Sequence, residues 1–599
     1  MCTLTGRRHK YREASFSQQG KNVKRSRMML FILLFLLVAS TALAKVQAPA
    51  LPGAQPISSE DRIYTGDQSS NTITVINPAT NEVLGTISLG DSRLTNLLNP
   101  QYLRSVNSHG LGFSRDGRFV VSISVASNSV NVIRTLDNSI VSQTYTDRAP
   151  HEAFFTADNR TVWVACRGTS FIDIIDGLAG GVVGRIKTAP GPSKVLFSPD
   201  GQTAYVNHIL SPTITIIDVS TRTVVATMSD LADKFSSDMM ISADGTRLWV
   251  AHKMIGQVSV IDLTTRSIVT FLATGPETNH PNFAIVNGTT YGFVTVAAVN
   301  ATKVYRQDTP AAIPTFVTAI RASGIEPYGI WPSPDNTRIY VVNEHSDTVD
   351  VIDTSTLSVV NTLHVGQEGQ ALIYVAGAVP TGTDKSVYTA NLGRQGLSER
   401  VENVLVSVTS NDSSTVAMNG SALITVRQLP GLDMLQIIGR HLHANVTYIL
   451  SAPPVSSDAP RSGIQIPLIE FNATAPDPTG CAVAPQVLGF VKVFGSFAFD
   501  SFIIEPKGAS RNSISNPVAS HLSTTSTTMP MELMAYCGDG LHICEVVAPT
   551  RTEKPWAGSI SAYPQCYDPA VYTCTSNFLC PANAPKIPGK YACGSVTAP

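Results

Sequence analysis

A repeating pattern with a period of about 42–47 residues constrains the fold of this chain more than any other feature. Each copy holds short apolar runs separated by tight turns such as FSPDG (197–201) and ISADG (241–245). Asp-Gly turns tolerate the positive backbone angles of hairpins, so each copy predicts four short antiparallel strands. Clear copies begin at Thr161, Thr203, Arg247 and Arg338, and weaker copies begin near Arg62, Arg118 and Thr289. The pattern therefore predicts a series of small all-β sheets.

The ends of the repeat predict how these sheets close. Seven copies with this period are typical of a seven-bladed β-propeller, here over residues 45–380. The first copy, RIYTGD, has no strand before it, whereas QALIYVAG (370–377) follows the seventh copy as an orphan. We expect the orphan strand to complete the first blade, because ring closure removes the exposed edges of the sheets.

The words YVN, WVA and YVVN, each followed by IID or VID, recur through the copies. Over roughly residues 60–380 they resemble the YVTN-repeat β-propellers, a family of exported and surface proteins. Related propellers include lactone hydrolases, haem and copper reductases and adhesive modules. The resemblance therefore implies the fold and leaves the function open.

Histidines recur at equivalent places in successive copies. In a propeller the end of the second strand and the start of the inner strand meet at one mouth, so these side chains are expected to face a shared funnel, with His280 and His345 nearby. Neutral imidazole is a common transition-metal ligand, which suggests a metal or cofactor site. The alternative is a polar rim without a ligand. The candidate metal ligands are His109, His151, His208, His252 and Cys166.

The N-terminal residues 1–44 are expected to be a secretory signal peptide. A basic segment precedes the apolar run MMLFILLFLLVASTALA (28–44), which ends in small residues. An uncleaved anchor is the alternative. The formal net charge of −1 gives no global basic field for nucleic acid or an anionic membrane. We expect a secreted protein of the extracellular space or cell wall, with glycosylation sequons at Asn159, Asn287, Asn300, Asn411, Asn419, Asn445 and Asn472.

The chain after the propeller is predicted to hold three further parts. Alternating runs such as SALITVRQLP (421–430) favour a β-sandwich over residues 381–507. Residues 508–530 are rich in Ser and Thr and are expected to be a linker. Residues 531–599 are expected to be a small disulfide-rich module, whose pairing the sequence does not choose. Its cysteines are Cys537, Cys544, Cys566, Cys574, Cys580 and Cys593.

The tail also suggests a ligand. CYDPAVYTCTSNFLCP (566–581) resembles carbohydrate-binding module family 52, and the resemblance implies β-1,3-glucan as the ligand. Aromatic rings offer flat faces to sugars, and Tyr567, Tyr572 and Tyr591 are the candidate platforms, whereas Phe578 is expected to belong to the small core. The tail is therefore predicted to bind cell-wall polysaccharide, either β-1,3-glucan or chitin.

Two functions follow from these features. The first is a secreted, non-enzymatic binding protein of the cell wall or matrix, with the propeller as interaction platform, another extracellular protein as a further partner and the tail as polysaccharide anchor. The second is a secreted enzyme, either a metal- or cofactor-dependent oxidoreductase or a lactone hydrolase, with its site in the funnel. The sequence has no GxSxG nucleophile motif. Converging side chains at the mouth would favour the enzyme, and a dispersed ring would favour the scaffold.

Overall fold

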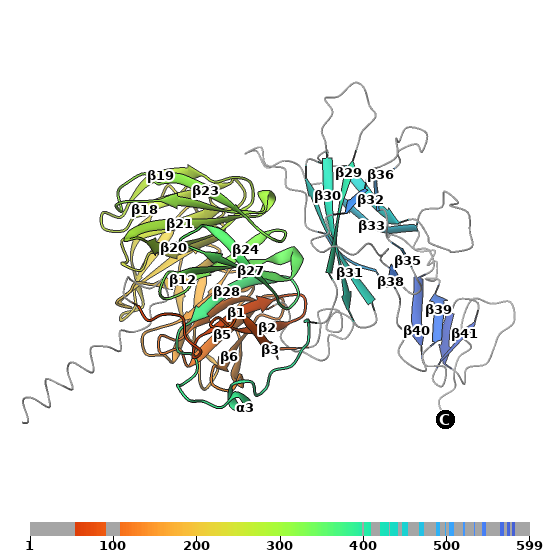
Figure 1. The fold of residues 1–599 in the computed structure, drawn as a ribbon, viewed down its shortest axis with the longest axis horizontal. Coiled ribbons are helices and arrows are strands. Elements are labelled where there is room, and N and C mark those ends of the chain that lie inside the picture. Colours follow the sequence, from red (N-terminus) through yellow and green to blue (C-terminus); the bar gives the residue numbers. More distant parts are fainter. Residues whose placement is uncertain are drawn as a thin grey trace, which may run out of the picture. The chain divides into compact units, whose positions relative to one another are not determined.

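The computed structural model describes residues 54–90 and 108–397, and beyond them short stretches, mostly strands, between residues 401 and 581. Residues 54–90 and 108–397 form seven four-stranded antiparallel sheets arranged as the blades of a propeller (Figure 1). The all-β, seven-bladed fold predicted from the repeat is therefore confirmed. Within each blade the strands follow one another from the inner strand outward.

The strand bounds of the blades are as follows. Blade 1 is β28 (Gly369–Val375), β1 (Arg62–Asp67), β2 (Thr72–Asn77) and β3 (Glu82–Ser88), and blade 2 is β4 (Ser108–Phe113), β5 (Phe119–Ser124), β6 (Ser129–Arg134) and β7 (Ile140–Tyr145). Blade 3 is β8 (Pro150–Phe155), β9 (Thr161–Cys166), β10 (Phe171–Asp176) and β11 (Val182–Lys187), and blade 4 is β12 (Pro192–Phe197), β13 (Thr203–His208), β14 (Ile214–Asp218) and β15 (Thr223–Met228). Blade 5 is β16 (Asp238–Ile241), β17 (Arg247–His252), β18 (Gln257–Asp262) and β19 (Ser267–Ala273). Blade 6 is β20 (Thr278–Val286), β21 (Thr289–Val296), β22 (Ala301–Arg306) and β23 (Thr315–Arg321), with the 3-10 turn η1 (Ala297–Val299). Blade 7 is β24 (Pro327–Pro332), β25 (Arg338–Asn343), β26 (Thr348–Asp353) and β27 (Ser358–His364), with the 3-10 turn η2 (Glu344–Ser346).

The ring closes through β28, which confirms the prediction for the orphan strand at residues 370–377. β28 pairs antiparallel with β1, with Tyr64 opposite Ile373, and the two strands lie side by side in Figure 1. Asp61 fastens the closure, because its carboxylate accepts hydrogen bonds from Tyr374 Oη at 2.7 Å and from the backbone N–H of Gly377 at 2.6 Å. Blade 1 is thus built from both ends of the propeller.

The blades pack face to face through large apolar side chains. Trp163 and Trp249 are fully buried, and the ring of Trp249 meets Phe283 of the next blade edge-on at 5.3 Å. Gly292 leaves room for that indole, since a Cβ on Gly292 would lie 2.2 Å from Trp249. The core therefore lies between adjacent blades, and the inner strands are left to line the central channel.

A β-bulge recurs near the mouth end of the inner strands. β4, β8 and β12 each hold one extra residue opposite the second strand of the blade: His109, His151 and Ser193. β28 has the same irregularity at Gln370. Bulges redirect side chains and often lie beside functional sites. The repeated bulge therefore distinguishes the mouth of the channel from the regular sheets below it.

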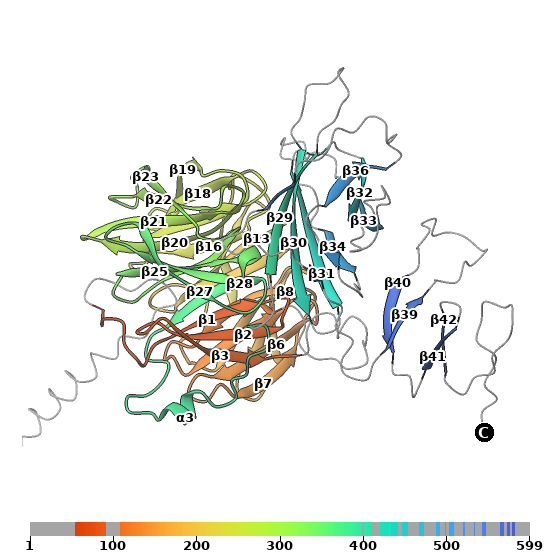
Figure 2. The ribbon, with the colours of Figure 1, turned by 45° about the vertical axis from the view of Figure 1, so that its right-hand side comes forward.

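The segment after β28 returns to the outside of the propeller. The short helix α3 (Lys385–Tyr388) lies beside β3 and β7 (Figure 2). The side-chain amide of Asn138 donates to the carbonyl oxygens of Tyr388 and Ala390, and Gly393 bridges to Thr86. Residues up to 397 therefore contact the blades, although the sequence placed the end of the propeller at 380.

Beyond residue 400 the described strands form separate small sheets. A five-stranded sheet holds β29 (Val401–Val408), β30 (Gly420–Leu429), β31 (Leu432–Arg440), β34 (Val487–Val491) and β37 (Ala519–His521), and a three-stranded sheet holds β32 (Thr447–Ala452), β33 (Ile466–Asn472) and β36 (Ile503–Pro506). Strand pairs are β35 (Phe497–Ala498) with β38 (Glu532–Leu533), β39 (His542–Val546) with β40 (Tyr563–Tyr567), and β41 (Tyr572–Thr575) with β42 (Phe578–Pro581). The sandwich and the disulfide-rich module remain predictions.

Several further sequence predictions fall outside the described part. These are the signal peptide, Tyr591, and the side chains of Tyr567, Tyr572 and the six tail cysteines. Of the sequon asparagines, Asn159, Asn287 and Asn300 adopt left-handed backbone angles at turns, and Asn472 is the last residue of β33. Glycosylation there stays a prediction. Among the residues that the structure describes, no helix has the length and apolar character needed to cross a membrane.

Candidate functional site in the propeller channel

Seven equivalent positions on the inner strands form one layer of the channel. Gly110, Glu152 and Lys194 each pair with the penultimate residue of the second strand of their blade, and so do Asp238 and Ala371. His280 and Gly329 occupy the corresponding places within the irregular parts of β20 and β24. Blades 3 to 6 therefore contribute ionisable residues, whereas blades 7, 1 and 2 contribute only Gly or Ala.

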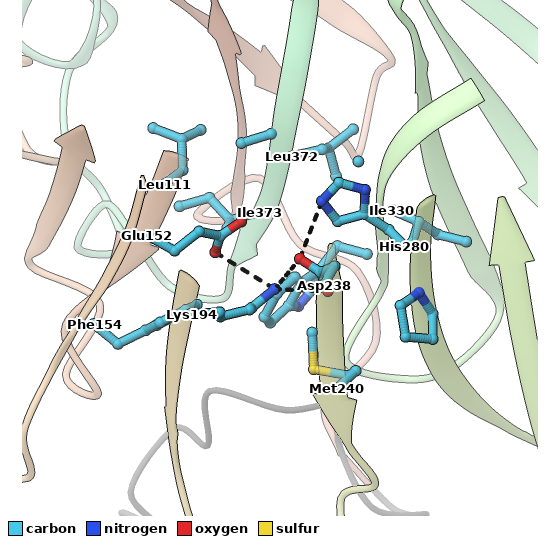
Figure 3. Close-up of a pocket in the computed structure, with 14 residues that line it drawn as sticks. Leu111, Glu152, Phe154, Lys194, Asp238, Met240, His280, Ile330, Leu372 and Ile373 are labelled. Atoms are coloured by element: carbon cyan, nitrogen blue, oxygen red, sulfur yellow. Dashed lines mark hydrogen bonds and ion pairs between the residues drawn. The ribbon is translucent and has the colours of Figure 1, made fainter. Parts of the chain in front are cut away.

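These four ionisable side chains, Glu152, Lys194, Asp238 and His280, form a continuous series that we call the charge chain (Figure 3). Lys194 Nζ lies 2.8 Å from Asp238 Oδ2 and 3.4 Å from Glu152 Oε2, and His280 Nε2 lies 3.1 Å from Asp238 Oδ2. The side chains of Glu152, Lys194 and Asp238 are 6%, 4% and 1% exposed. The charge chain thus joins four blades through buried ion pairs.

The electrostatics divide the roles of the charge chain. Burial opposes the charge of Lys194, but Asp238 and Glu152 raise its pKa above the ordinary value, so it stays an ammonium ion. Burial also opposes the charge of Asp238, yet His280 and Lys194 lower its pKa. Burial raises the pKa of Glu152, and the attraction of Lys194 offsets this only in part. Asp238 is therefore the stable carboxylate, and Glu152 is the carboxyl that more readily takes a proton.

A small cavity lies against the charge chain. Glu152, Lys194, Asp238 and His280 line its polar side, and Phe154, Met240 and Trp331 are among its apolar lining residues. About 10 Å³ is open to the centre of a water molecule, which is roughly the room that one ordered water needs. The imidazole of His280 makes one contact with Asp238, and its Nδ1 has no hydrogen-bond partner among the described residues. A water or a substrate atom would complete the bonding of that nitrogen.

The same layer contains a possible metal-binding set that the geometry argues against. Atoms of Glu152, Asp238 and His280 lie within 4.8 Å of one another. However, the ammonium group of Lys194 already contacts both carboxylates. A cation at that point would be repelled by Lys194, so the charge chain reads as an ion-pair network.

Arg167 and Lys253 place two cationic groups near the mouth. Arg167 follows β9, and its guanidinium donates to Ser193 Oγ at 2.7 Å and to the carbonyl oxygen of Ser237 at 3.2 Å, so it spans from blade 3 to blade 5. Burial lowers the pKa of Arg167 to about 10, which leaves it charged at neutral pH. Lys253 Nζ lies 5.3 Å from the centre of the Tyr328 ring, and that ring lies 4.8 Å from the His280 ring. The mouth therefore favours ligands with negative or electron-rich groups.

His109 and His151, two of the predicted metal ligands, do lie together at the mouth. Their Nε2 atoms are 2.7 Å apart, and His151 Nδ1 lies 3.1 Å from the carbonyl oxygen of Ser193. A carbonyl only accepts, so His151 Nδ1 carries the proton and His151 Nε2 accepts from His109. Burial, with Arg167 and His109, holds the pKa of His151 well below its ordinary value. This assignment uses both nitrogens of His151 in hydrogen bonds.

The other three predicted ligands serve their own blades. His208 Nε2 lies 2.9 Å from Thr215 Oγ1, and His252 Nε2 lies 2.8 Å from Ser259 Oγ, each on the third strand of the same blade. Burial lowers the pKa of both histidines to about 4, so they are neutral. Cys166 is buried, and burial raises the pKa of its thiol to about 12. The structure does not gather the five predicted ligands into one metal-binding group among the described residues.

The charge chain was missed in the sequence because each member stands alone there. Glu152 in PHEAFF, Lys194 in PSKVLF and Asp238 in SSDMMI occupy the same place in successive copies. An ionisable residue inside an otherwise buried inner strand was the available signal. For His280 the sequence predicts only a position near the mouth.

A family model matches a large part of the propeller. Residues 59–306, less than half of the chain, match the family model described as lactonase, 7-bladed β-propeller. Among solved structures, a Kuenenia stuttgartiensis hydrazine synthase matches at 20% identity over 52% of this chain and 97% of that chain, with a TM-score of 0.42.

The Pseudomonas aeruginosa periplasmic gluconolactonase PpgL matches at 17% identity over 53% and 99%, also with a TM-score of 0.42. The dihydro-haem d1 dehydrogenase NirN matches at 14% over 66% and 75%, with a TM-score of 0.40. No curated protein matches the chain. The chain therefore carries a seven-bladed β-propeller, most of which matches the model of the lactonase propellers.

Proposed function

We propose that the propeller is a hydrolase that opens a lactone or a related cyclic ester at the mouth of its channel. The observation that carries the proposal is the buried Asp238–His280 pair, in which Nδ1 of His280 has no hydrogen-bond partner among the described residues. The cationic Arg167 lies near the same mouth. The match of residues 59–306 to the lactonase propeller model supports the same reaction class.

His280 acts as the general base in this proposal. Asp238 accepts a hydrogen bond from His280 Nε2–H, which orients the imidazole and leaves the lone pair of Nδ1 free. As the oxygen of a water molecule adds to the lactone carbonyl carbon, Nδ1 takes the proton that the water loses. When the ring C–O bond breaks, His280 returns that proton to the leaving alkoxide. The product is an open-chain hydroxy acid.

Arg167 stabilises the negative charge that develops on the carbonyl oxygen. Its contacts with Ser193 and Ser237 fix the guanidinium before substrate binds, and fixed donors are more effective than mobile ones. Lys253 and Tyr328 bind the remainder of the substrate. Lys194 holds Asp238 in place and is a positioning residue, because its ammonium group is occupied by two carboxylates.

The test is hydrolysis of a panel of γ- and δ-lactones, neutral and acid-bearing, by the purified full chain, followed in a pH-stat because each turnover releases an acid. His280→Asn should lower kcat/KM by at least about 100-fold, the usual contribution of a general base. Arg167→Gln should lower kcat by a similar factor. His364→Gln, an exposed change on β27, is the matched control and should leave the rate unchanged. A folded wild type that opens no lactone of the panel, or a His280→Asn variant at full rate, would refute the proposal.

This proposal favours the enzyme over the non-enzymatic binding platform, the other function that the sequence suggests. Side chains that converge at the mouth of the channel favour an enzyme, whereas a dispersed ring of polar side chains favours a binding platform. The His and Cys side chains expected to converge are mostly dispersed, but the charge chain converges instead. Secretion and polysaccharide binding by the tail remain predictions, and the proposed chemistry does not depend on them.

A further inference from the structure

A second buried polar cluster lies on blade 7, apart from the charge chain. Glu326 immediately precedes β24, and Glu344 and His345 form the start of η2 after β25. All three side chains are buried. One ligand atom from each lies within 4.8 Å of the others, and His345 Nε2 lies 2.9 Å from Glu326 Oε2. Two carboxylates and an imidazole therefore converge on one small volume.

The backbone fixes this convergence. The N–H of Glu344 donates to the carbonyl oxygen of Glu326 at 2.9 Å, and the N–H of His345 donates to that of Ile325 at 3.2 Å. Glu326 has a φ angle of 60°, the left-handed region that a residue with a side chain seldom adopts. The two connecting segments are thus held against each other, and the three side chains approach from fixed positions.

Gln370 supplies an independent sign of a missing partner. This residue is the bulge residue of β28, it is 6% exposed, and its amide nitrogen donates to Glu344 Oε1. Its Oε1 is buried and has no hydrogen-bond partner among the described residues. A buried amide oxygen without a partner is unfavourable by about 1–3 kcal/mol. Because its nitrogen contacts Glu344, this unpartnered oxygen lies at the edge of the cluster.

The ligand atoms of the cluster are of the kinds that bind divalent cations. Lys253 Nζ is 3.8 Å from Glu326 Oε1, at the outer limit of an ion pair, so this ammonium group does not fill the space between the three side chains. A divalent ion would neutralise both carboxylates.

We propose that Glu326, Glu344 and His345 bind a divalent transition-metal ion, with Gln370 Oε1 as a further ligand or as the partner of a metal-bound water. A mixed set of carboxylate, imidazole and amide oxygen suits Mn²⁺ or Zn²⁺. The site differs from the one predicted from the sequence, since it uses none of the five residues named there. None of its ligands takes part in the proposed lactone chemistry, whose base lies in the charge chain, although Lys253, which binds substrate in that proposal, lies beside Glu326.

Mn²⁺ is the better probe because it prefers oxygen and imidazole ligands, whereas Zn²⁺ would also bind any cysteine thiolate that is not in a disulfide. The full chain is treated with a chelator, dialysed and titrated with Mn²⁺, and free Mn²⁺ is measured by electron paramagnetic resonance. We expect one Mn²⁺ per chain. Glu344→Gln and His345→Ala should each weaken binding at least 10-fold, and His364→Ala, which removes an exposed imidazole, should not.

Two further measurements keep the result decisive. Tryptophan fluorescence and near-UV circular dichroism establish that each variant is folded. If a variant does not fold, Gln370→Met, which keeps a similar volume, replaces it and should weaken binding. The wild type should also unfold at a higher temperature with Mn²⁺, because a ligand of the native state stabilises it. A wild type that binds no Mn²⁺, or folded variants that bind it as tightly as the wild type, would overturn the proposal.

Discussion

Lys194→Met is the sharpest test of the charge chain as a structural element. Methionine keeps much of the length and apolar volume of lysine but removes the ammonium group. Two carboxylates, Asp238 at 2.8 Å and Glu152 at 3.4 Å, then lose their shared cation inside the channel. At an effective dielectric constant of about 20, each of these attractions is worth about 5–6 kcal/mol before desolvation is counted.

The net loss is smaller, because Lys194 no longer has to be desolvated. Removing one partner of a buried ion pair destabilises a protein by about 3–5 kcal/mol, since it leaves an uncompensated buried charge. The loss should depend on pH. Without Lys194, the folded-state pKa of Glu152 rises further above its unfolded value. A carboxyl with a raised folded-state pKa loses stability as pH rises, so the variant should be closer to wild type at pH 5 than at pH 8.

Urea unfolding of the full chain, followed by tryptophan fluorescence, measures the effect, because Trp163, Trp249 and Trp331 are all buried in the propeller. Lys187→Met, the same substitution at an exposed position of β11, is the control and should change stability by less than about 0.5 kcal/mol. A Lys194→Met variant that loses less than about 1 kcal/mol at pH 8, or loses the same amount at pH 5 and pH 8, would show that the carboxylates do not depend on Lys194.

Three other predictions concern the ring. Gly112→Ala should strongly lower the melting temperature, because the added Cβ would lie 1.9 Å from the carbonyl oxygen of Ala153. Gly393→Ala is the control, because no atom lies nearer than 3.9 Å to its added Cβ. Equal melting temperatures of the two variants would contradict the close approach of β4 and β8. Burial raises the pKa of Asp67 to about 7. As the pH rises from about 4 to 7, the free energy of unfolding of the wild type should therefore fall relative to that of Asp67→Asn, and parallel profiles of unfolding free energy against pH would refute this. Deletion of residues 370–377 should leave an open edge and cause aggregation or loss of the unfolding transition, and a monomeric, cooperatively unfolding product would contradict closure by β28.

The fold could be predicted because its signals are local. Each blade repeats the same turns and apolar runs. Because the first copy lacks an inner strand and one strand is left over after the seventh copy, the repeat itself assigns β28 to blade 1. The same repetition explains the recurring histidines without a ligand. His208 and His252 recur because each bonds a hydroxyl of its own blade.

Residues of the shared channel behave in the opposite way. Glu152, Lys194 and Asp238 differ from copy to copy, because an ion-pair chain needs opposite charges on neighbouring blades. Their complementarity exists only after the ring has closed and blades one repeat apart have come together. The pattern of one copy therefore shows an isolated ionisable residue in an inner strand but not its partners. The cluster of Glu326, Glu344 and His345 depends on tertiary contacts in the same way.

The closure of blade 1 also sets an order of events during synthesis. The hydrogen bond between Tyr374 and Asp61 joins residues 313 positions apart, so β1 leaves the ribosome long before its partner β28 exists. Until then the edge of β1 has no neighbour inside the ring. Such long-range pairing is slow, and an unpaired edge is prone to aggregate. The nascent propeller should consequently be most vulnerable just before its last inner strand emerges, and a chaperone that covers the edge of β1 would act at that stage.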